Sequence, residues 1–183
     1  KGMPYLYQGE EIGLPNTYFD RLEDYRDVES INYAKILLEN HSQQEVLYII
    51  NERSRDNGRT PMVWNNQTNY GFTTGKPWLN FSQHPQLKTV QDQLEDKSSI
   101  FYWYQKLIAL RHDHPIVSKG KVKWIDSDNH TFHYYRVLEE QRWLVLNNLT
   151  QQPSSFSLDG AYRVVMSNYN RSEVSETIEL KPY

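Results

Sequence analysis

The chain has 183 residues, and its 20 Lys+Arg against 23 Asp+Glu give a formal net charge of −3. That length suits one ordinary domain or two small ones. The charges are spread along the whole sequence, which argues against a nucleic-acid-binding arm or a polybasic membrane patch. The longest apolar runs, such as residues 46–50, are too short to span a bilayer. Because the sequence has no cysteine, a disulfide framework, a thiolate zinc site and a cysteine nucleophile are excluded.

The first residues indicate a piece of a longer protein. Lys1-Gly2-Met3 offers neither an initiator methionine nor a signal leader, and an apolar run starts at once. The run Pro4–Gln8 is short and β-prone and meets a turn at Gly9, which predicts a buried strand. We therefore expect a fragment that begins close to a strand.

Helical patterns follow this strand. Apolar residues recur at helical spacing over residues 23–39. Ser42 and Glu45 make a capping-box pattern that opens a second helix to about Arg53. A third helix is predicted from residue 100 to about 112, closed by Pro115. Residues 54–97 between them have no sustained period, and their aromatic residues favour an ordered functional loop.

From about residue 120 the pattern becomes that of an antiparallel sandwich or barrel. Turn residues separate short β-type runs at Val122–Ile125, Thr131–Val137, Trp143–Leu149, Ser154–Leu158, Tyr162–Ser167 and Thr177–Leu180. Asp126-Ser127-Asp128 resembles the start of a calcium loop, but it lacks the glycine and the final glutamate, so a β-turn is the better interpretation.

One segment, Ser54–Trp64, is a candidate binding site. Arg55 and Arg59 flank a polar turn in which Asp56 or Asn57 can hydrogen-bond the backbone and hold the arginines in fixed directions. A guanidinium held in this way can bind a pair of sugar hydroxyls or a carboxylate. The chemistry alone leaves open a surface turn with an internal Arg–Asp pair.

Other patterns give no catalytic site. Glu10-Glu11 are adjacent, whereas a catalytic carboxylate pair must face each other across a substrate. His112-x-His114 lacks the spacing of three or four that puts two metal ligands on one helix face. No nucleophile elbow, phosphate-binding glycine loop or dinucleotide fingerprint occurs. We expect no cofactor and no metal.

Several blocks of the sequence form a recognisable set. In chain order they are Pro4–Gly13, Glu23–Ser30, Ser54–Trp64, Gly71-Phe72-Thr73 with Pro77-Trp78, and Leu107–Arg111 before Pro115. Together they resemble the glycoside hydrolase family 13 α-glucosidases, in particular the exo-acting branch of oligo-1,6-glucosidases, dextran glucosidases and trehalose-6-phosphate hydrolases. The resemblance covers essentially the whole chain, and the Ser54–Trp64 block is its most specific part.

The resemblance implies an α+β fragment, the last β/α units of a (β/α)8 barrel followed by an antiparallel β-sandwich. Residues 1–116 would be the end of the barrel, with Pro4–Gln8 as its eighth strand and residues 54–97 as a long substrate-side loop. Residues 117–183 would be the sandwich. The catalytic nucleophile and acid/base of a retaining α-glucosidase would lie upstream of Lys1, so the fragment itself would be inactive and no residue here is assigned their roles.

The resemblance also implies that Arg59 contacts the substrate by holding the glucose at the non-reducing end. Arg55, Asp56 and Asn57 would be the scaffold of that loop. Val63 and Asn65 depart from the family pattern, which puts loop details in doubt. Trp64 and Phe72, with Tyr70 and Trp78, could form a wall for the aglycone sugar or a small core that orders the loop, and burial favours the core.

The expected partner is therefore an α-glucoside oligosaccharide in the full-length enzyme, with neither nucleic acid nor membrane, in the cytoplasm. The substrate could be an isomalto-oligosaccharide, a dextran end or trehalose 6-phosphate. An unpaired barrel strand exposes a sheet edge, so self-association of the truncated barrel is expected. The alternative function is a freestanding carbohydrate-binding or structural β-domain.

Overall fold

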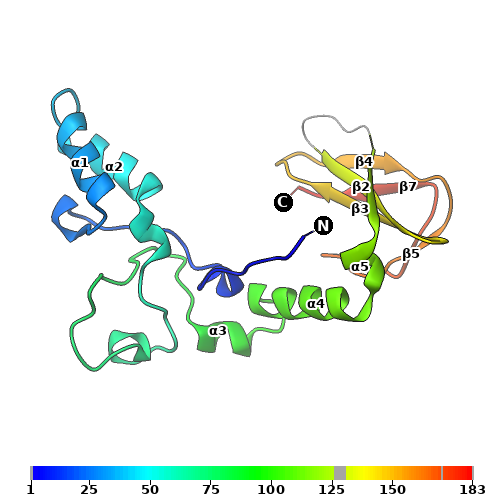
Figure 1. Ribbon diagram of the computed structural model, residues 1–183, viewed down its shortest axis with the longest axis horizontal. Coiled ribbons are helices and arrows are strands. Elements are labelled where there is room, and N and C mark those ends of the chain that lie inside the picture. Colours follow the sequence, from blue (N-terminus) through cyan, green and yellow to red (C-terminus); the bar gives the residue numbers. More distant parts are fainter. Residues whose placement is uncertain (1, 126–130, 170, 183) are drawn as a thin grey trace. The chain divides into compact units, whose positions relative to one another are not determined.

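The computed structural model of the chain describes residues 2–125, 131–169 and 171–182 (Figure 1). The chain divides into two compact units. One comprises residues 4–109, and the other comprises residues 110–183 together with residues 1–3. The boundary at residue 110 falls within helix α4 (Ile100–Asp113). Both the predicted calcium-like turn at Asp126–Asp128 and the other residues of that loop lie outside the described ranges.

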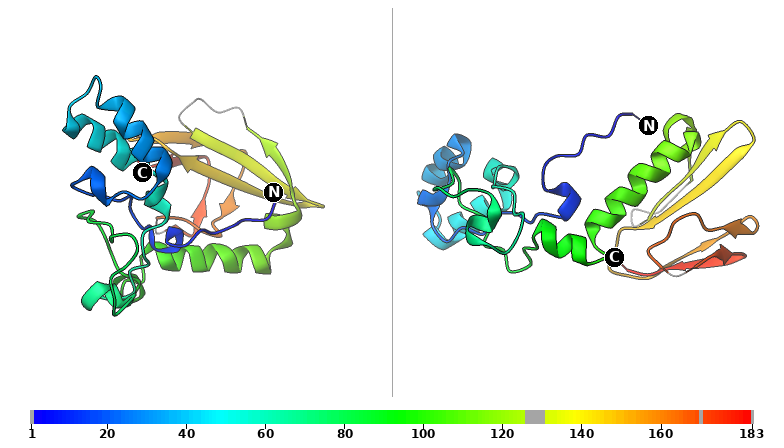
Figure 2. Two further views of the ribbon diagram at one scale, coloured as in Figure 1. Left: turned by 60° about the vertical axis from the view of Figure 1, so that its left-hand side comes forward. Right: turned by 90° about the horizontal axis from the view of Figure 1, so that it is seen from below.

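The unit of residues 4–109 is built from short helices and ordered loops. The α-helices α1 and α2 run side by side, as both views show (Figures 1 and 2). Three further α- and 3-10 helices follow in the loop region, and two 3-10 helices precede α1. The elements are η1 (Glu10–Ile12), η2 (Leu22–Asp24), α1 (Val28–Leu37), α2 (Gln43–Arg53), η3 (Arg55–Gly58), η4 (Thr68–Gly71), α3 (Val90–Glu95) and the start of α4.

Side-chain caps set where these helices begin. The predicted capping box is present, because Ser42 Oγ accepts from the Glu45 N–H (3.3 Å) and Glu45 Oε2 accepts from the Ser42 N–H (2.9 Å). Helix α1 begins at Val28, later than the predicted residue 23, because Asp27 caps it and the preceding residues form η2. Helix α3 was not predicted, although Thr89 and Asp92 form a second capping box at its start.

Two small hydrophobic clusters hold this unit together. The first lies between α1, α2 and the segment before them, and its buried members are Phe19, Tyr25, Ala34, Val46, Ile50 and Leu79. The second lies under the loop region and consists of Ile12, Met62 and Val63, with Tyr70 and Phe81 among the residues packed against it. The loop of residues 54–97 is therefore ordered by apolar contacts at its base, as the aromatic content indicated.

The structure does not contain the strand that was predicted over Pro4–Gln8. Residues 2–7 have no strand assignment, and Tyr5 is 88% exposed. A strand is defined by hydrogen bonds to a neighbouring strand, and the described residues of the 4–109 unit contain none. The segment carries the β-prone sequence of a barrel strand without the ladder that would make it one.

The other unit is an antiparallel β structure, as predicted. Its first sheet has the order β1-β2-β3, and two-stranded sheets pair β4 with β7 and β5 with β6. The His133 ring on β2 contacts the Phe156 ring on β4 (centroids 4.9 Å apart), so the first two sheets face each other (Figure 2, right). The elements are α5 (Pro115–Lys119), β1 (Lys121–Trp124), β2 (Thr131–Leu138), β3 (Gln141–Asn148), β4 (Ser154–Ser157), β5 (Tyr162–Arg163), β6 (Glu173–Val174) and β7 (Thr177–Leu180).

The opposite face of β2 holds α5 in place. Arg136 is buried, and its guanidinium donates to the backbone carbonyls of Ile116 (3.2 Å) and Val117 (2.6 Å) on α5. Further along the same face, Phe132 and Tyr134 pack against Trp124 of the neighbouring strand. Among the described residues, no helix combines the length and the apolar character needed to cross a membrane.

We expect the exposed segment Pro4–Tyr7 to make the isolated chain self-associate, because Tyr5, Leu6 and Tyr7 present apolar surface to solvent. The double substitution Tyr5→Ser with Leu6→Ser should shift the mass measured by multi-angle light scattering towards that of the monomer. Tyr48→Ser, a similarly exposed tyrosine on α2, is the control and should leave the mass unchanged. A wild-type chain that is monomeric at every concentration would contradict this expectation.

Candidate functional site

The turn that carries the predicted site is 3-10 helix η3 with its flanking residues Ser54 and Arg59. Ser54 caps the turn, because its Oγ accepts from the Asp56 N–H (3.1 Å). The same Oγ accepts from Ser30 Oγ on α1 (2.9 Å), and both serines are buried. The turn is therefore tied at its first residue to the helix that lies beside it.

Asp56 is fully buried and fixes the turn more firmly. Its Oδ2 accepts two backbone hydrogen bonds, from the N–H of Arg26 (2.6 Å) and from that of Asp27 (2.9 Å). Its other oxygen, Oδ1, is buried and has no hydrogen-bond partner. Because burying a carboxylate is costly unless it is paired, the surroundings of Oδ1 matter for any function of this turn.

Asp27 is the N-cap of α1 and faces the same turn. Its Oδ2 accepts from the Ser30 N–H (3.2 Å) and from Ser30 Oγ (2.7 Å). Burial opposes ionisation of this carboxyl, but the hydrogen bonds from the Ser30 hydroxyl and from backbone N–H groups outweigh it, and the pKa of Asp27 is lowered. Asp27 is therefore an anion at neutral pH.

The Arg59 guanidinium lies beside these two carboxylates. Its Nη1 is 3.8 Å from Asp56 Oδ1 and 4.0 Å from Asp27 Oδ1, and its side chain is 42% exposed. Part of the guanidinium thus faces the two anions and part is open to solvent. The other arginine of the turn, Arg55, points elsewhere and pairs with Glu29 on the surface (2.5 Å).

Asn57 links the turn to two other parts of this unit, Thr17 before η2 and Asn51 in α2. Its Oδ1 accepts from the Thr17 N–H (2.9 Å) and from Thr17 Oγ1 (2.6 Å), while its Nδ2 donates to the Asn51 carbonyl (2.9 Å). Asn51 in turn accepts from the Tyr25 hydroxyl (2.6 Å). Burial raises the pKa of Tyr25 to about 12, so this phenol remains a hydrogen-bond donor at neutral pH.

The aromatic residues after the turn are divided between the surface and the core. Trp64 and Phe72 are each 47% exposed, and Trp78 is more exposed still, so none of the three is buried as the core interpretation expects, although Phe72 meets the Phe81 ring edge-on (centroids 6.2 Å apart). It holds for Tyr70, whose ring packs at a tilt against Phe81 with the ring centroids 5.0 Å apart. Backbone bonds still fix Trp64, since both its own N–H and that of Asn65 donate to the Tyr70 carbonyl.

The most important residue that the sequence argument overlooked is Asp27. It lies within the Glu23–Ser30 block, and Asp27-Val28-Glu29-Ser30 is an N-cap sequence that predicts the start of a helix at Val28. Its approach to Arg59 depends on how α1 packs beside η3, which no local pattern encodes. Thr17 was overlooked for the same reason, since its partner Asn57 is 40 residues away.

The remaining predicted positions have structural roles. Glu11 Oε2 accepts from the Gly9 N–H (2.9 Å) and braces the turn at η1. The His114 ring packs against Trp143, with the ring centroids 4.9 Å apart. Within the described residues no three His, Asp or Glu side chains gather as the ligands of a metal ion would.

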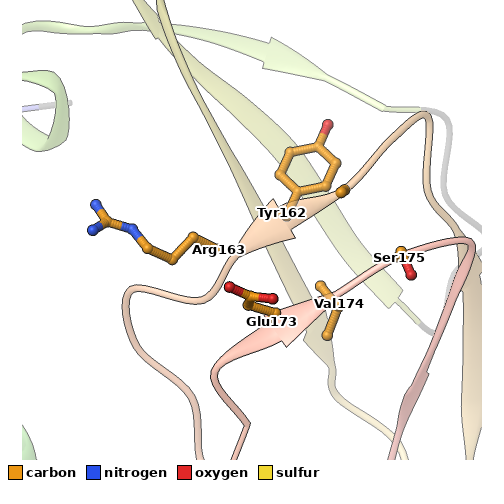
Figure 3. Close-up of a pocket in the computed structure, with 6 residues that line it drawn as sticks. Tyr162, Arg163, Glu173, Val174 and Ser175 are labelled. Atoms are coloured by element: carbon orange, nitrogen blue, oxygen red, sulfur yellow. The ribbon is translucent and has the colours of Figure 1, made fainter.

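A pocket of about 360 Å³ lies on the β5–β6 ribbon of the sandwich unit (Figure 3). Arg163 and Glu173 are opposite each other in the register of this ribbon. The neighbouring Tyr162 hydroxyl is engaged, because it accepts from Arg142 (3.0 Å) and donates to Asp159. The pocket contains none of the predicted site residues. Its lining residues are Ala161, Tyr162, Arg163, Glu173, Val174 and Ser175.

Two known protein families match the chain. Residues 1–120 match the family described as alpha amylase, catalytic domain, and residues 132–183 match the alpha-amylase SusG C-terminal domain. The chain belongs to the alpha-amylase family, glycoside hydrolase family 13, and contains the end of its catalytic domain followed by its C-terminal domain.

Individual relatives agree with this assignment. The chain is 39% identical over its whole length to the trehalose-6-phosphate hydrolase of Escherichia coli and 38% identical to the oligo-1,6-glucosidase of Bacillus cereus. The whole chain superposes on 35% of the chain in the crystal structure of Bacillus licheniformis trehalose-6-phosphate hydrolase, at 37% sequence identity and a TM-score of 0.91. The chain spans 34% of the length of the two curated relatives and thus corresponds to part of these enzymes, as expected.

We expect the Asp27 carboxylate to stabilise the fold only where it is ionised. Because its pKa is lowered on folding, its contribution is fully present above the unfolded value of about 3.9 and is lost as the pH falls through the folded value. Asp27→Asn should therefore lower the free energy of unfolding by about 1 kcal/mol at pH 7. Denaturant titrations from pH 7 to pH 2.5 should show the two proteins converge, and a difference independent of pH would contradict this account.

Proposed function

We propose that this chain is part of a retaining α-glucosidase that removes glucose from the non-reducing end of its substrates, and that it contributes to substrate binding. The observation that carries the proposal is the setting of Arg59, a half-exposed guanidinium oriented by two buried carboxylates. The relatives support the reaction class, since they include an oligo-1,6-glucosidase, a glucan 1,6-α-glucosidase and a trehalose-6-phosphate hydrolase.

In such a reaction one carboxylate attacks the anomeric carbon, a second carboxyl group protonates the leaving oxygen, and water then releases glucose. Asp27 and Asp56 do not fit either role, because each is buried and uses one oxygen to hold backbone N–H groups. The two reacting groups would come from the part of the enzyme that precedes this chain. Arg59 would donate hydrogen bonds to hydroxyls of the terminal glucose and so fix the ring relative to those groups.

The neighbouring residues would complete the substrate side of the loop. Asp56 and Asn57 would act as scaffold through their backbone hydrogen bonds, and Arg55 through its pair with Glu29. The exposed rings of Trp64 and Phe72 support a wall for the aglycone sugar, since a stacking ring must have a free face. We also propose residues 1–116 as the end of the barrel and residues 117–183 as the sandwich, in a cytoplasmic enzyme acting on α-1,6-linked glucosides or trehalose 6-phosphate.

Arg59→Ala should lower the catalytic efficiency of an enzyme containing this chain by about 10- to 100-fold, as expected for the loss of charged hydrogen bonds to the substrate. The melting temperature should also fall, because Arg59 is the counter-charge of the buried Asp56 Oδ1, but the loss of activity should exceed what the loss of stability explains. The measurement is kcat/KM for isomaltose together with a thermal scan.

Arg53→Ala is the matched control, because Arg53 is an exposed arginine at the end of α2. It should leave both quantities unchanged. If Arg59→Ala lowered stability as much as activity, the arginine would be part of the fold and the proposed function would lose its main support.

A further inference from the structure

Asp159 and Gly160 form the single Asp-Gly pair of the sequence, in the link between β4 and β5 of the sandwich unit. Both residues are exposed. A Cβ atom built on Gly160 would meet no described atom within 4 Å beyond its chain neighbours, so the space around this residue is open. Because glycine has no side chain, its backbone nitrogen is unshielded and can be reached by the side chain of the preceding aspartate.

An Asp-Gly pair in this setting can rearrange without an enzyme. The glycine nitrogen attacks the side-chain carboxyl carbon of the aspartic acid, a C–N bond forms, and the carboxyl hydroxyl leaves with the amide proton as water. Solvent water then opens the resulting succinimide ring. Opening at the former side-chain carbonyl restores aspartate, whereas opening at the backbone carbonyl gives isoaspartate. The carboxyl group loses water only when it is protonated, so the ionised form is resistant.

Three side chains hold the Asp159 carboxylate, and we call them the Asp159 cage. Arg142 Nη2 on β3 lies 2.9 Å from Oδ2, the Tyr162 hydroxyl on β5 donates to Oδ1, and the Tyr135 hydroxyl on β2 lies 3.5 Å from Oδ2. The Arg142 guanidinium also lies over the Tyr135 ring, with its Cζ 4.8 Å from the centroid. The hydrogen bond from Tyr162 and the charge of Arg142 lower the pKa of Asp159, which is therefore ionised at neutral pH.

We propose that Asp159 is a site of isoaspartate formation and that the Asp159 cage keeps this site closed in the folded chain. The cage favours the ionised carboxylate, which cannot lose water. It also binds both oxygens from three different strands, which restrains the carboxyl carbon from approaching the Gly160 nitrogen. Loss of one cage residue opens the site.

Isoaspartate at residue 159 would loosen the unit that the cage joins. The carboxylate connects Arg142 and Tyr135 of the first sheet with Tyr162 of β5. In isoaspartate an additional methylene enters the backbone and the charged group sits directly on the α carbon, so it no longer reaches the same three donors. The β5–β6 ribbon, whose strands have two residues each, would then lose this polar contact with the first sheet (Figure 3).

The first experiment incubates the 183-residue chain at about pH 5, roughly one unit above the ordinary Asp pKa of about 3.9. Chromatography and electron-transfer mass spectrometry of the peptide containing Asp159 measure isoaspartate. Arg142→Ala should raise the rate of its formation by about two- to fivefold, as the strength of an exposed ion pair allows. Tyr162→Phe, which removes only a hydroxyl, should act in the same direction.

Arg171→Ala is the matched control. Arg171 also lies over a tyrosine ring of this unit, with its Cζ 5.2 Å from the Tyr169 centroid, whereas the arginine paired with Asp159 in the described chain is Arg142. Its replacement should leave the rate unchanged. If the folded Arg142→Ala and Tyr162→Phe variants formed isoaspartate no faster than the unmodified chain, the proposed role of the cage would be overturned.

Gly160→Ala identifies the reacting nitrogen. The structure has room for the added methyl group, and Gly160 is not among the glycines with positive φ, so the variant should fold normally. Because the methyl group shields the backbone nitrogen, adding Gly160→Ala to Arg142→Ala should slow isoaspartate formation several-fold. An unchanged rate would show that the product arises by another route.

A further measurement needs no substitution. The unmodified chain should form isoaspartate at residue 159 more slowly when folded than in concentrated urea at the same pH, because the cage exists only in the folded state. Equal rates in the folded and unfolded chain would overturn the proposal.

Discussion

The loop region of this protein depends on one buried carboxylate. Asp56 accepts hydrogen bonds from the N–H groups of Arg26 and Asp27, about 30 residues earlier in the chain, and so fixes the Ser54–Arg59 turn to the start of α1. The paired serines Ser30 and Ser54 reinforce the same connection, and Asn57 fixes the turn to Thr17 in the segment before η2. An ion buried in this way is tolerated only when its oxygens are satisfied by donors or by a counter-charge.

This constraint has a functional consequence. The turn contains two arginines, yet only Arg59 lies against the buried anions, while Arg55 extends over the surface to Glu29. The fold therefore places two arginines of the same turn in different surroundings. A guanidinium that is anchored on one side and open on the other is suited to bind a polar ligand with a fixed orientation.

The elements that the sequence predicted correctly are those with local causes. Ser42 and Glu45 set the start of α2, and the alternation of short β-type runs with turns indicated the antiparallel unit. Pro4–Gln8 failed as a strand because a strand exists only with a neighbour to pair with. The importance of Asp27 was missed because its partner Arg59 lies far along the sequence and meets it only through tertiary packing. The local turn chemistry indicated Arg55 and Arg59 alike, and only the family resemblance pointed to Arg59, whose contact with substrate stays a prediction.

The measurement that tests the central claim most directly is a crystal structure, with glucose bound, of an enzyme that contains this chain. The account predicts that Arg59 donates to hydroxyls of the glucose while its Nη1 stays beside Asp27 Oδ1 and Asp56 Oδ1, and that Asp56 Oδ2 keeps both backbone hydrogen bonds. An Arg59 side chain turned away from the glucose, or a guanidinium that reaches the sugar only after leaving both carboxylates, would contradict it.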